Sequence, residues 1–115
     1  MILFLNIKHR NLQLKLIKSF EKNFNKYFIA CRPSQWTKNL IVFSAPLFSF
    51  SFDSNIWLSA VYAFFIFCLI SSSIYLINDS LDVKSDRNHP RKKFRPIASG
   101  KVSIRSALFI ATVLL

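Results

Sequence analysis

Three aspartates, Asp79, Asp82 and Asp86, have the chemistry and the spacing expected of residues that hold a metal ion. Positions i, i+3 and i+7 lie on one face of an α-helix, where carboxylates repel one another unless a cation neutralises them. An uncharged, apolar stretch precedes them directly, and charge beside a bilayer is costly and usually functional. These observations predict a cation site, whereas the alternative is a solvated acidic face offset by neighbouring Lys and Arg side chains.

The donor types in this stretch favour Mg²⁺, which proteins bind through one or two carboxylates, waters and the phosphates of a substrate. The predicted metal ligands are Asn78, Asp79, Asp82 and Asp86. A basic cluster follows, made of Arg91, Lys92, Lys93 and Arg95. Because such cations bind phosphate oxygens, the stretch predicts a surface that handles diphosphates. The alternative for the basic cluster is attachment to anionic lipid headgroups.

The distribution of charge predicts a membrane protein. The chain has 115 residues, a length typical of one domain, and it is 52% hydrophobic with a net charge of +11. Its Lys and Arg residues fall into two blocks, 8–38 and 84–105, with none between them. This segregation is the positive-inside pattern, which predicts an integral protein of the cell (inner) membrane with a cytoplasmic N-terminus and Asp-rich loop. A nucleic-acid partner is disfavoured because an uncharged span separates the basic blocks and no binding motif occurs.

The hydrophobic segments predict an all-α fold, namely a polytopic transmembrane helical bundle. The clearest span is 57–77, which is uncharged and about 31 Å long as a helix. A second span is expected at 35–52, with a kink at Pro46. Ser103 is expected to cap a third helix, 104–115, which is too short to cross a bilayer. The Asp-rich cytoplasmic loop is then 78–103, and the chain represents an N-terminal fragment with two spans and the start of a third.

Residues 1–30 predict an amphipathic helix in the headgroup region of the membrane. An apolar stripe recurs every four positions and consists of Leu12, Leu16, Phe20, Phe24 and Phe28. Lysines form the face beside the stripe, as expected for a helix on an anionic leaflet. The alternative is a helix packed on the protein's own cytoplasmic surface.

Arg32-Pro33 is expected to end this helix, because the residue before a proline disfavours the α conformation. Trp36 then lies at the expected interfacial height.

Four motifs along the chain resemble those of the UbiA superfamily of intramembrane prenyltransferases. NDSLDVKSD at 78–86 matches the NDxxDxxxD pattern of that superfamily. RPSQWTKN at 32–39, His89-Pro90 and RPIASG at 95–100 resemble the branch that makes decaprenylphosphoryl-phosphoribose. The resemblance covers the domain 31–115 and implies an all-α bundle with more helices and a second Asp-containing motif in a later loop. On that basis this chain is expected to be a fragment that is inactive alone.

The resemblance also implies the chemistry of the parent enzyme. The catalytic carboxylates are expected to be Asp79, Asp82 and Asp86, which with Asn78 hold Mg²⁺ on the diphosphate of phosphoribosyl diphosphate. A polyprenyl phosphate then attacks the anomeric carbon of the sugar. The expected phosphate contacts are Arg32, Lys38, Arg91, Lys92 and Arg95. Expected partners are membrane lipid, a polyprenyl phosphate or diphosphate, and a complementary chain that supplies the missing helices.

Two alternatives to this function stay open from the sequence. One is a prenyltransferase that acts on an aromatic acceptor and binds a polyprenyl diphosphate at the same Asp motif. The other is a non-enzymatic small membrane protein whose basic ends serve as an anchor or an interaction site.

Overall fold

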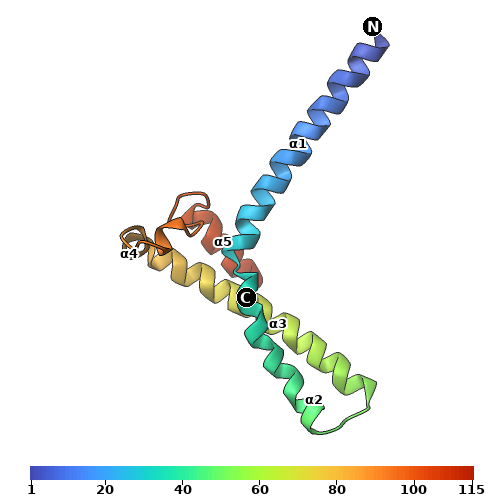
Figure 1. Cartoon of the computed structure of the whole chain (residues 1–115), viewed down its shortest axis with the longest axis vertical. Coiled ribbons are helices and arrows are strands. Elements are labelled where there is room, and N and C mark those ends of the chain that lie inside the picture. Colours follow the sequence, from blue (N-terminus) through green and yellow to red (C-terminus); the bar gives the residue numbers. More distant parts are fainter.

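The computed structural model describes all 115 residues and consists of helices without strands. Its elements are α1 (Ile2–Ala30), the 3₁₀ helix η1 (Pro33–Phe43), α2 (Ser44–Phe48), α3 (Ser54–Leu81), α4 (Val83–Arg87), the 3₁₀ helix η2 (Lys92–Phe94) and α5 (Ile104–Leu114). Figure 1 shows α1 projecting away from a body in which the other elements gather around α3. The expected all-α class is confirmed.

The longest apolar helix, α3, contains the expected span 57–77 and extends beyond it at both ends. Asp53 begins it, because its Oδ1 accepts a hydrogen bond from the Asn55 N–H at 2.9 Å. With a mean hydropathy of 2.2 in its most apolar part, α3 is the one helix long and apolar enough to cross a membrane. Its length of about 42 Å exceeds the hydrocarbon thickness of a bilayer. The residues around Asp79 therefore belong to the end of this helix rather than to a loop.

The stretch expected to form a second span, 35–52, is not one α-helix. It is divided between η1 and α2, and the chain leaves the helix after Phe48. Pro46 has no N–H to donate to the preceding turn, which interrupts the α-helical ladder. The two elements together rise about 30 Å and run alongside α3 in Figure 1. The expected number of membrane-spanning helices is therefore not confirmed.

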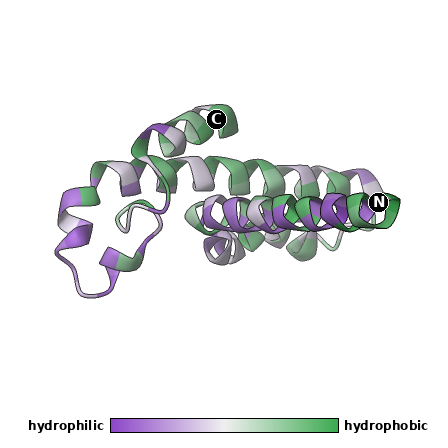
Figure 2. Ribbon diagram, turned by 90° about the horizontal axis from the view of Figure 1, so that it is seen from above, coloured by the Kyte–Doolittle hydropathy of each residue, from purple (hydrophilic) through white to green (hydrophobic).

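Small side chains allow α5 to pack closely against α3. Ser73, Ala107 and Ala111 are all buried at this contact, and the Ser73 hydroxyl donates to the Ala111 carbonyl oxygen at 2.8 Å. Figure 2 shows α5 lying along one end of α3, whose residues are mostly hydrophobic. Ser103 begins α5 as expected, since its Oγ accepts from the Ser106 N–H at 3.2 Å. Ser73 near the end of α3 thus serves close helix packing.

A small hydrophobic core lies where the ends of α1, α3, α4 and α5 meet. Its buried members are Ala30, Leu76, Val83, Ile97, Val102, Ala107 and Ala111. The turn between η2 and α5 joins this core through Ile97 and Val102, and the Val102 N–H donates to the Pro96 carbonyl at 3.0 Å. Gly100 completes the turn with a φ of +83°, a left-handed conformation that favours glycine. The charged loop is consequently a folded element and not a flexible tether.

Gly100→Ala is expected to lower the free energy of unfolding by about 1–2 kcal/mol, which is the cost of a left-handed conformation for a residue with a Cβ. A Cβ at this position meets no atom within 4 Å, so the expected loss comes from the backbone alone. Thermal and denaturant unfolding in detergent micelles measures the change. Gly100→Asn is the control, because Asn tolerates this conformation better than Ala. Equal stability of the Ala variant and the parent chain would contradict the prediction.

The N-terminal helix α1 contacts the body near its last turn, where Tyr27 and Ala30 pack on the core and Phe28 meets the Trp36 ring edge-on. The expected apolar stripe is exposed, and three of its rings stack along the helix, with centroids of Phe20, Phe24 and Phe28 about 6 Å apart. Because most of α1 extends away from the body, the alternative of packing on the protein's own surface is not what the structure shows. Its place at a membrane surface stays a prediction.

Arg32 ends the helical run of α1 as expected, but by a different backbone route. The prediction assumed an extended residue before Pro33, whereas Arg32 has a φ of 52° and a ψ of 59°, which is left-handed. A left-handed residue of this kind often follows the end of an α-helix and turns the chain sharply. This turn directs the Arg32 side chain back toward α3.

Candidate functional site

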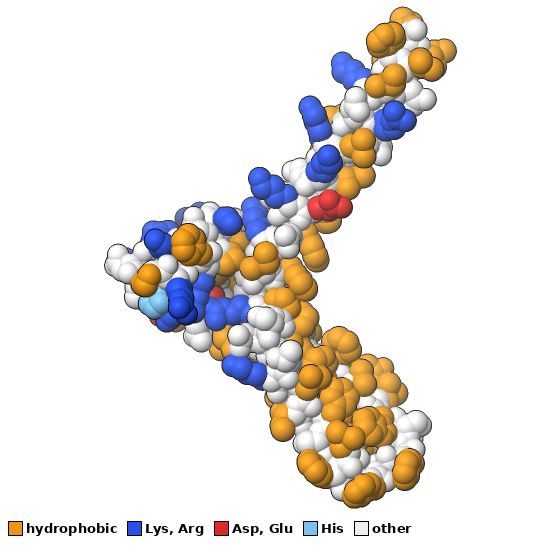
Figure 3. Space-filling view, in the orientation of Figure 1, with side chains coloured by type: hydrophobic (Ala, Val, Ile, Leu, Met, Phe, Trp, Pro, Cys, Tyr) orange, Lys and Arg blue, Asp and Glu red, His pale blue; other side chains and the backbone are white.

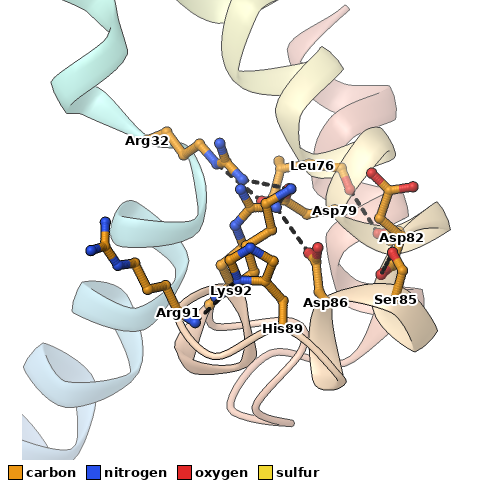
Figure 4. A network of polar contacts seen from close by, with 11 residues as sticks. Arg32, Leu76, Asp79, Asp82, Ser85, Asp86, His89, Arg91 and Lys92 are labelled. Carbon is orange, nitrogen blue, oxygen red and sulfur yellow. Dashed lines mark hydrogen bonds and ion pairs between the residues drawn. The ribbon is translucent and has the colours of Figure 1, made fainter.

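Two buried carboxylates, those of Asp79 and Asp86, lie together at the end of α3 (Figure 4). Asp79 lies in the last turns of α3, and Asp86 lies on the short helix α4. The two helices are nearly continuous: only Asp82 departs from α geometry, and its carbonyl still accepts from the Asp86 N–H at 2.8 Å. The expected spacing on one helix face is therefore preserved for these two residues.

Arginines from two distant parts of the chain neutralise these carboxylates. Arg32 donates to both oxygens of Asp79, with its Nε 3.1 Å from Oδ2. Arg95 donates through one nitrogen, Nη1, to Asp79 Oδ1 at 3.2 Å and to Asp86 Oδ2 at 2.9 Å. The four side chains form a network that we call the arginine–aspartate cluster. Its formal charges balance, which satisfies carboxylates that are otherwise costly to bury.

Each arginine of the cluster is followed by a proline, and the backbone of Arg95 takes the conformation that a following proline favours. Pro96 holds Arg95 in an extended conformation, with φ −58° and ψ 144°, as expected for a residue before proline. The guanidinium of Arg32 also lies over the ring of Tyr75, 4.8 Å from its centroid, a cation–π contact. Tyr75 lies one turn before Asp79 on the same face of α3, so Arg32 is held by two residues of that face, the Tyr75 ring and the Asp79 carboxylate. Contacts with α3 therefore fix the Arg32 side chain, and the two carboxylates fix the Arg95 side chain.

A cavity of about 510 Å³ opens beside the cluster. Arg32, Asp79 and Arg95 line it on one side, and Ser34 and Gln35 from the start of η1 line it on another. Cavities of this size are typical of small-ligand sites. Both guanidiniums are partly exposed, at 22% and 26% of their side-chain surface, and so remain reachable by a ligand. This arrangement can bind an anionic group that carries several oxygens, such as a phosphate or diphosphate.

The remaining predicted metal ligands do not join the cluster. Asp82 and Asn78 are exposed, and Figure 4 shows the Asp82 carboxylate pointing away from the arginines. The Arg95 guanidinium lies between Asp79 and Asp86, where a metal shared by these carboxylates is expected. No three His, Cys, Asp or Glu side chains lie close enough together to hold a metal ion. The donor types suit Mg²⁺, but in this arrangement the four residues do not fit a shared Mg²⁺.

The other predicted phosphate contacts lie apart from the cluster. Lys38, on η1, is exposed, as are Arg91 and Lys92 around η2. The backbone N–H groups of Arg91 and Lys92 donate to Nδ1 of His89, at 3.1 and 3.2 Å, which makes this histidine a cap for the turn. In Figure 4 the Arg91 side chain points away from the carboxylates. Of the five predicted phosphate contacts, the structure thus brings Arg32 and Arg95 into the site.

Two site residues were not predicted from the sequence. Tyr75 holds Arg32, and its position four residues before Asp79 was the available signal. Arg87 donates from Nε to the Ala98 carbonyl at 3.0 Å and so ties α4 to the turn that carries Arg95. No sequence pattern indicates that contact, because it joins an exposed arginine to a backbone oxygen.

Cys31, beside the site, is half-buried, and its burial raises the pKa of its thiol, which disfavours the reactive thiolate.

Residues 40–115 of the chain match the UbiA prenyltransferase family. A decaprenyl-phosphate phosphoribosyltransferase of Corynebacterium glutamicum is 43% identical over 89 residues, which cover 75% of this chain and 27% of that protein. The protein of the same name from Mycolicibacterium smegmatis is 48% identical over 90 residues, or 74% of this chain and 28% of that protein. The nodulation protein NoeC of Azorhizobium caulinodans is 37% identical over 92 residues, or 80% of this chain and 30% of that protein. The chain therefore spans less than a third of the length of these relatives.

Proposed function

This chain belongs to the UbiA prenyltransferase family, and on that basis we propose that it takes part in transferring phosphoribose from phosphoribosyl diphosphate to a polyprenyl phosphate. Members of the family are integral membrane proteins, and α3 is long and apolar enough to cross a bilayer. The relatives at 43–48% identity support the choice of substrates, since both are named for phosphoribosyl transfer to decaprenyl phosphate. We propose the inner membrane as the location, with α1 and the Asp-rich end of α3 cytoplasmic.

The observation that carries the proposal is the arginine–aspartate cluster beside its cavity. Arg32 and Arg95 present guanidinium groups that suit the oxygens of a diphosphate. Asp79 and Asp86 hold these guanidiniums in place, which is electrostatic preorganisation toward a leaving group that gains negative charge. In the proposed reaction the bond from the anomeric carbon to the diphosphate breaks. A bond from that carbon to an oxygen of the lipid phosphate forms.

Mg²⁺ remains part of the proposal as a cofactor, but through Asn78 and Asp82, which lie one helical turn apart, and not through the four predicted ligands together. It supplies positive charge near phosphates when bound. Asp82 and Asn78 are the exposed members of this set and are free of the arginines. Substitution of Asp82 therefore tests metal binding directly, whereas substitution of a buried aspartate would also break its ion pair with an arginine.

We propose that the phosphoribosyl transfer takes place in a helical bundle that is larger than these 115 residues form. One face of α3 is apolar and exposed, and it carries Leu58, Tyr62, Phe65 and Leu69 at 46–63% exposure. Such a face suits lipid tails or further helices, whether these belong to the same polypeptide or to a complementary chain. The lipid part of the acceptor is proposed to lie along this face, with its phosphate at the level of the cluster.

Ligand binding by the purified chain in detergent micelles tests the proposal. With Mg²⁺ present, we expect ¹⁴C-labelled phosphoribosyl diphosphate to be retained in equilibrium dialysis in preference to an isoprenoid diphosphate. Asp82→Asn is expected to weaken this binding about tenfold, the value of one lost charge contact. Lys84→Gln, an exposed neighbour on α4, is the matched control and should leave binding unchanged.

Other outcomes of the same measurement contradict the proposal in different ways. Stronger retention of the isoprenoid diphosphate indicates a prenyltransferase with an aromatic acceptor. Retention of neither ligand indicates a membrane protein without this activity. Binding of phosphoribosyl diphosphate that is unchanged by Asp82→Asn and by removal of Mg²⁺ contradicts the metal part of the proposal.

A further inference from the structure

A second hollow, of about 850 Å³, lies between α1 and the turn that follows η2. Three lysines line it: Lys22 and Lys26 from α1, and Lys101 from the turn. Asn23 and Asn25 from α1 add amide groups, and Phe94 forms part of the opposite wall. Figure 3 shows Lys and Arg side chains gathered along α1 and over the adjoining charged loop. We call this hollow the lysine groove. It adjoins the cavity beside the arginine–aspartate cluster, with which it shares Ile29, Phe94 and Pro96.

The positive charge in the lysine groove has no acidic counterpart. No Asp or Glu lines the groove, and the ion pairs in the chain join only Arg32 and Arg95 to Asp79 and Asp86. Lys22 and Lys26 stand four residues apart, a spacing at which like charges on a helix repel. Lys101 adds a third cation from another element. An anion in the groove would remove this repulsion, so the groove is electrostatically prepared for one.

The wall that carries Lys101 is fixed in place. The Ser99 N–H donates to the Arg95 carbonyl at 2.8 Å, the Gly100 N–H donates to the Ile97 carbonyl at 3.2 Å, and Val102 is fully buried directly after Lys101. On the other side, Ala30 anchors the end of α1 in the core. Lys101 therefore projects from a backbone that is held, and Lys26 lies one turn before the anchored end of α1, which lowers the entropy lost when a ligand binds.

We propose that the lysine groove binds a phosphate group through lysines that do not line the neighbouring cavity, where the proposed transfer takes place. Three ammonium groups and two side-chain amides supply the donors that phosphate oxygens need. The α1 wall lies outside residues 40–115, so the groove combines a family-matched turn with an element that the family match does not include. The phosphate belongs either to a lipid headgroup at the membrane surface or to a soluble molecule, and the experiment below separates these sources.

The test compares two triple variants of the full chain in detergent micelles. The groove triple is Lys22→Gln, Lys26→Gln and Lys101→Gln. The control triple is Lys8→Gln, Lys15→Gln and Lys18→Gln, which removes the same charge from α1 outside the groove. Calorimetric titrations use inorganic diphosphate as the soluble probe and dioctanoyl phosphatidic acid as the lipid probe. We expect the groove triple to weaken binding of at least one probe about tenfold, and the control triple to change it less than about twofold.

The outcome assigns or rejects the site. Loss confined to phosphatidic acid supports a lipid headgroup, and loss for diphosphate, alone or with the lipid, supports a soluble phosphate. Equal loss in both triples overturns the proposal, because net charge rather than the groove then governs binding. Absence of measurable binding of either probe by the parent chain overturns it as well. Circular dichroism of each triple verifies that helix content is retained, as expected for substitutions of side chains that make no ion pair.

Discussion

Asp79→Asn is expected to lower the free energy of unfolding by about 3 kcal/mol, whereas Asp82→Asn should change it by less than about 0.5 kcal/mol. Asp79 is 5% exposed and accepts hydrogen bonds from two arginines, so its loss leaves both guanidiniums without their shared carboxylate. Asp82 is exposed and its side chain makes no ion pair. The arginines are 22% and 26% exposed, so water offsets part of the loss and the lower end of the range for buried pairs applies.

Equilibrium unfolding of both variants in mixed detergent micelles, followed by far-ultraviolet circular dichroism, measures this difference. The comparison also separates stability from ligand binding. Asp82→Asn is expected to weaken Mg²⁺-dependent binding while keeping its stability, and Asp79→Asn is expected to lower both binding and stability. If the two variants unfold at the same denaturant concentration, the arginine–aspartate cluster does not stabilise the fold as the structure indicates.

Arg95→Met is expected to destabilise the chain by about 3 kcal/mol, because Arg95 alone pairs with Asp86. Asp86 is 2% exposed, and the variant leaves its carboxylate buried without a cation. Methionine retains much of the length of the arginine stem, so that the measured loss reports charge and hydrogen bonding more than packing. Arg91→Met is the matched control, since Arg91 is exposed and makes no ion pair.

A double variant shows whether the cluster acts as one unit. Arg95→Met combined with Asp79→Asn should cost less than the sum of the two single losses, since each removes a partner of the other. A strictly additive result means that the two side chains stabilise the chain independently and excludes coupling through their contact.

The prediction of the span at 57–77 succeeded because it depends on local composition. The length of this uncharged, mostly apolar stretch favours a helix, and Asp53 and Ser103 cap their helices through bonds to residues two or three positions away. The stretch at 35–52 was harder to predict, since hydropathy does not distinguish an α-helix from the 3₁₀ geometry found in η1. The aspartate spacing likewise predicted one shared face, but Asp82 departs from helical geometry and its side chain is exposed.

The sequence by itself determined that this protein is all-helical and that acidic and basic groups suited to phosphate chemistry follow its longest apolar helix. It also carried the motifs that place the chain in its family. Only the tertiary structure decided which charges meet. Asp79 pairs with Arg32 across 47 positions and with Arg95 across 16, whereas Arg91 and Lys92, closer in sequence to Asp86 than Arg95 is, remain exposed. The physical reason is that ion pairing depends on distance after packing. The turn at Arg32 and the folded loop before α5 set those distances, and no local pattern records them.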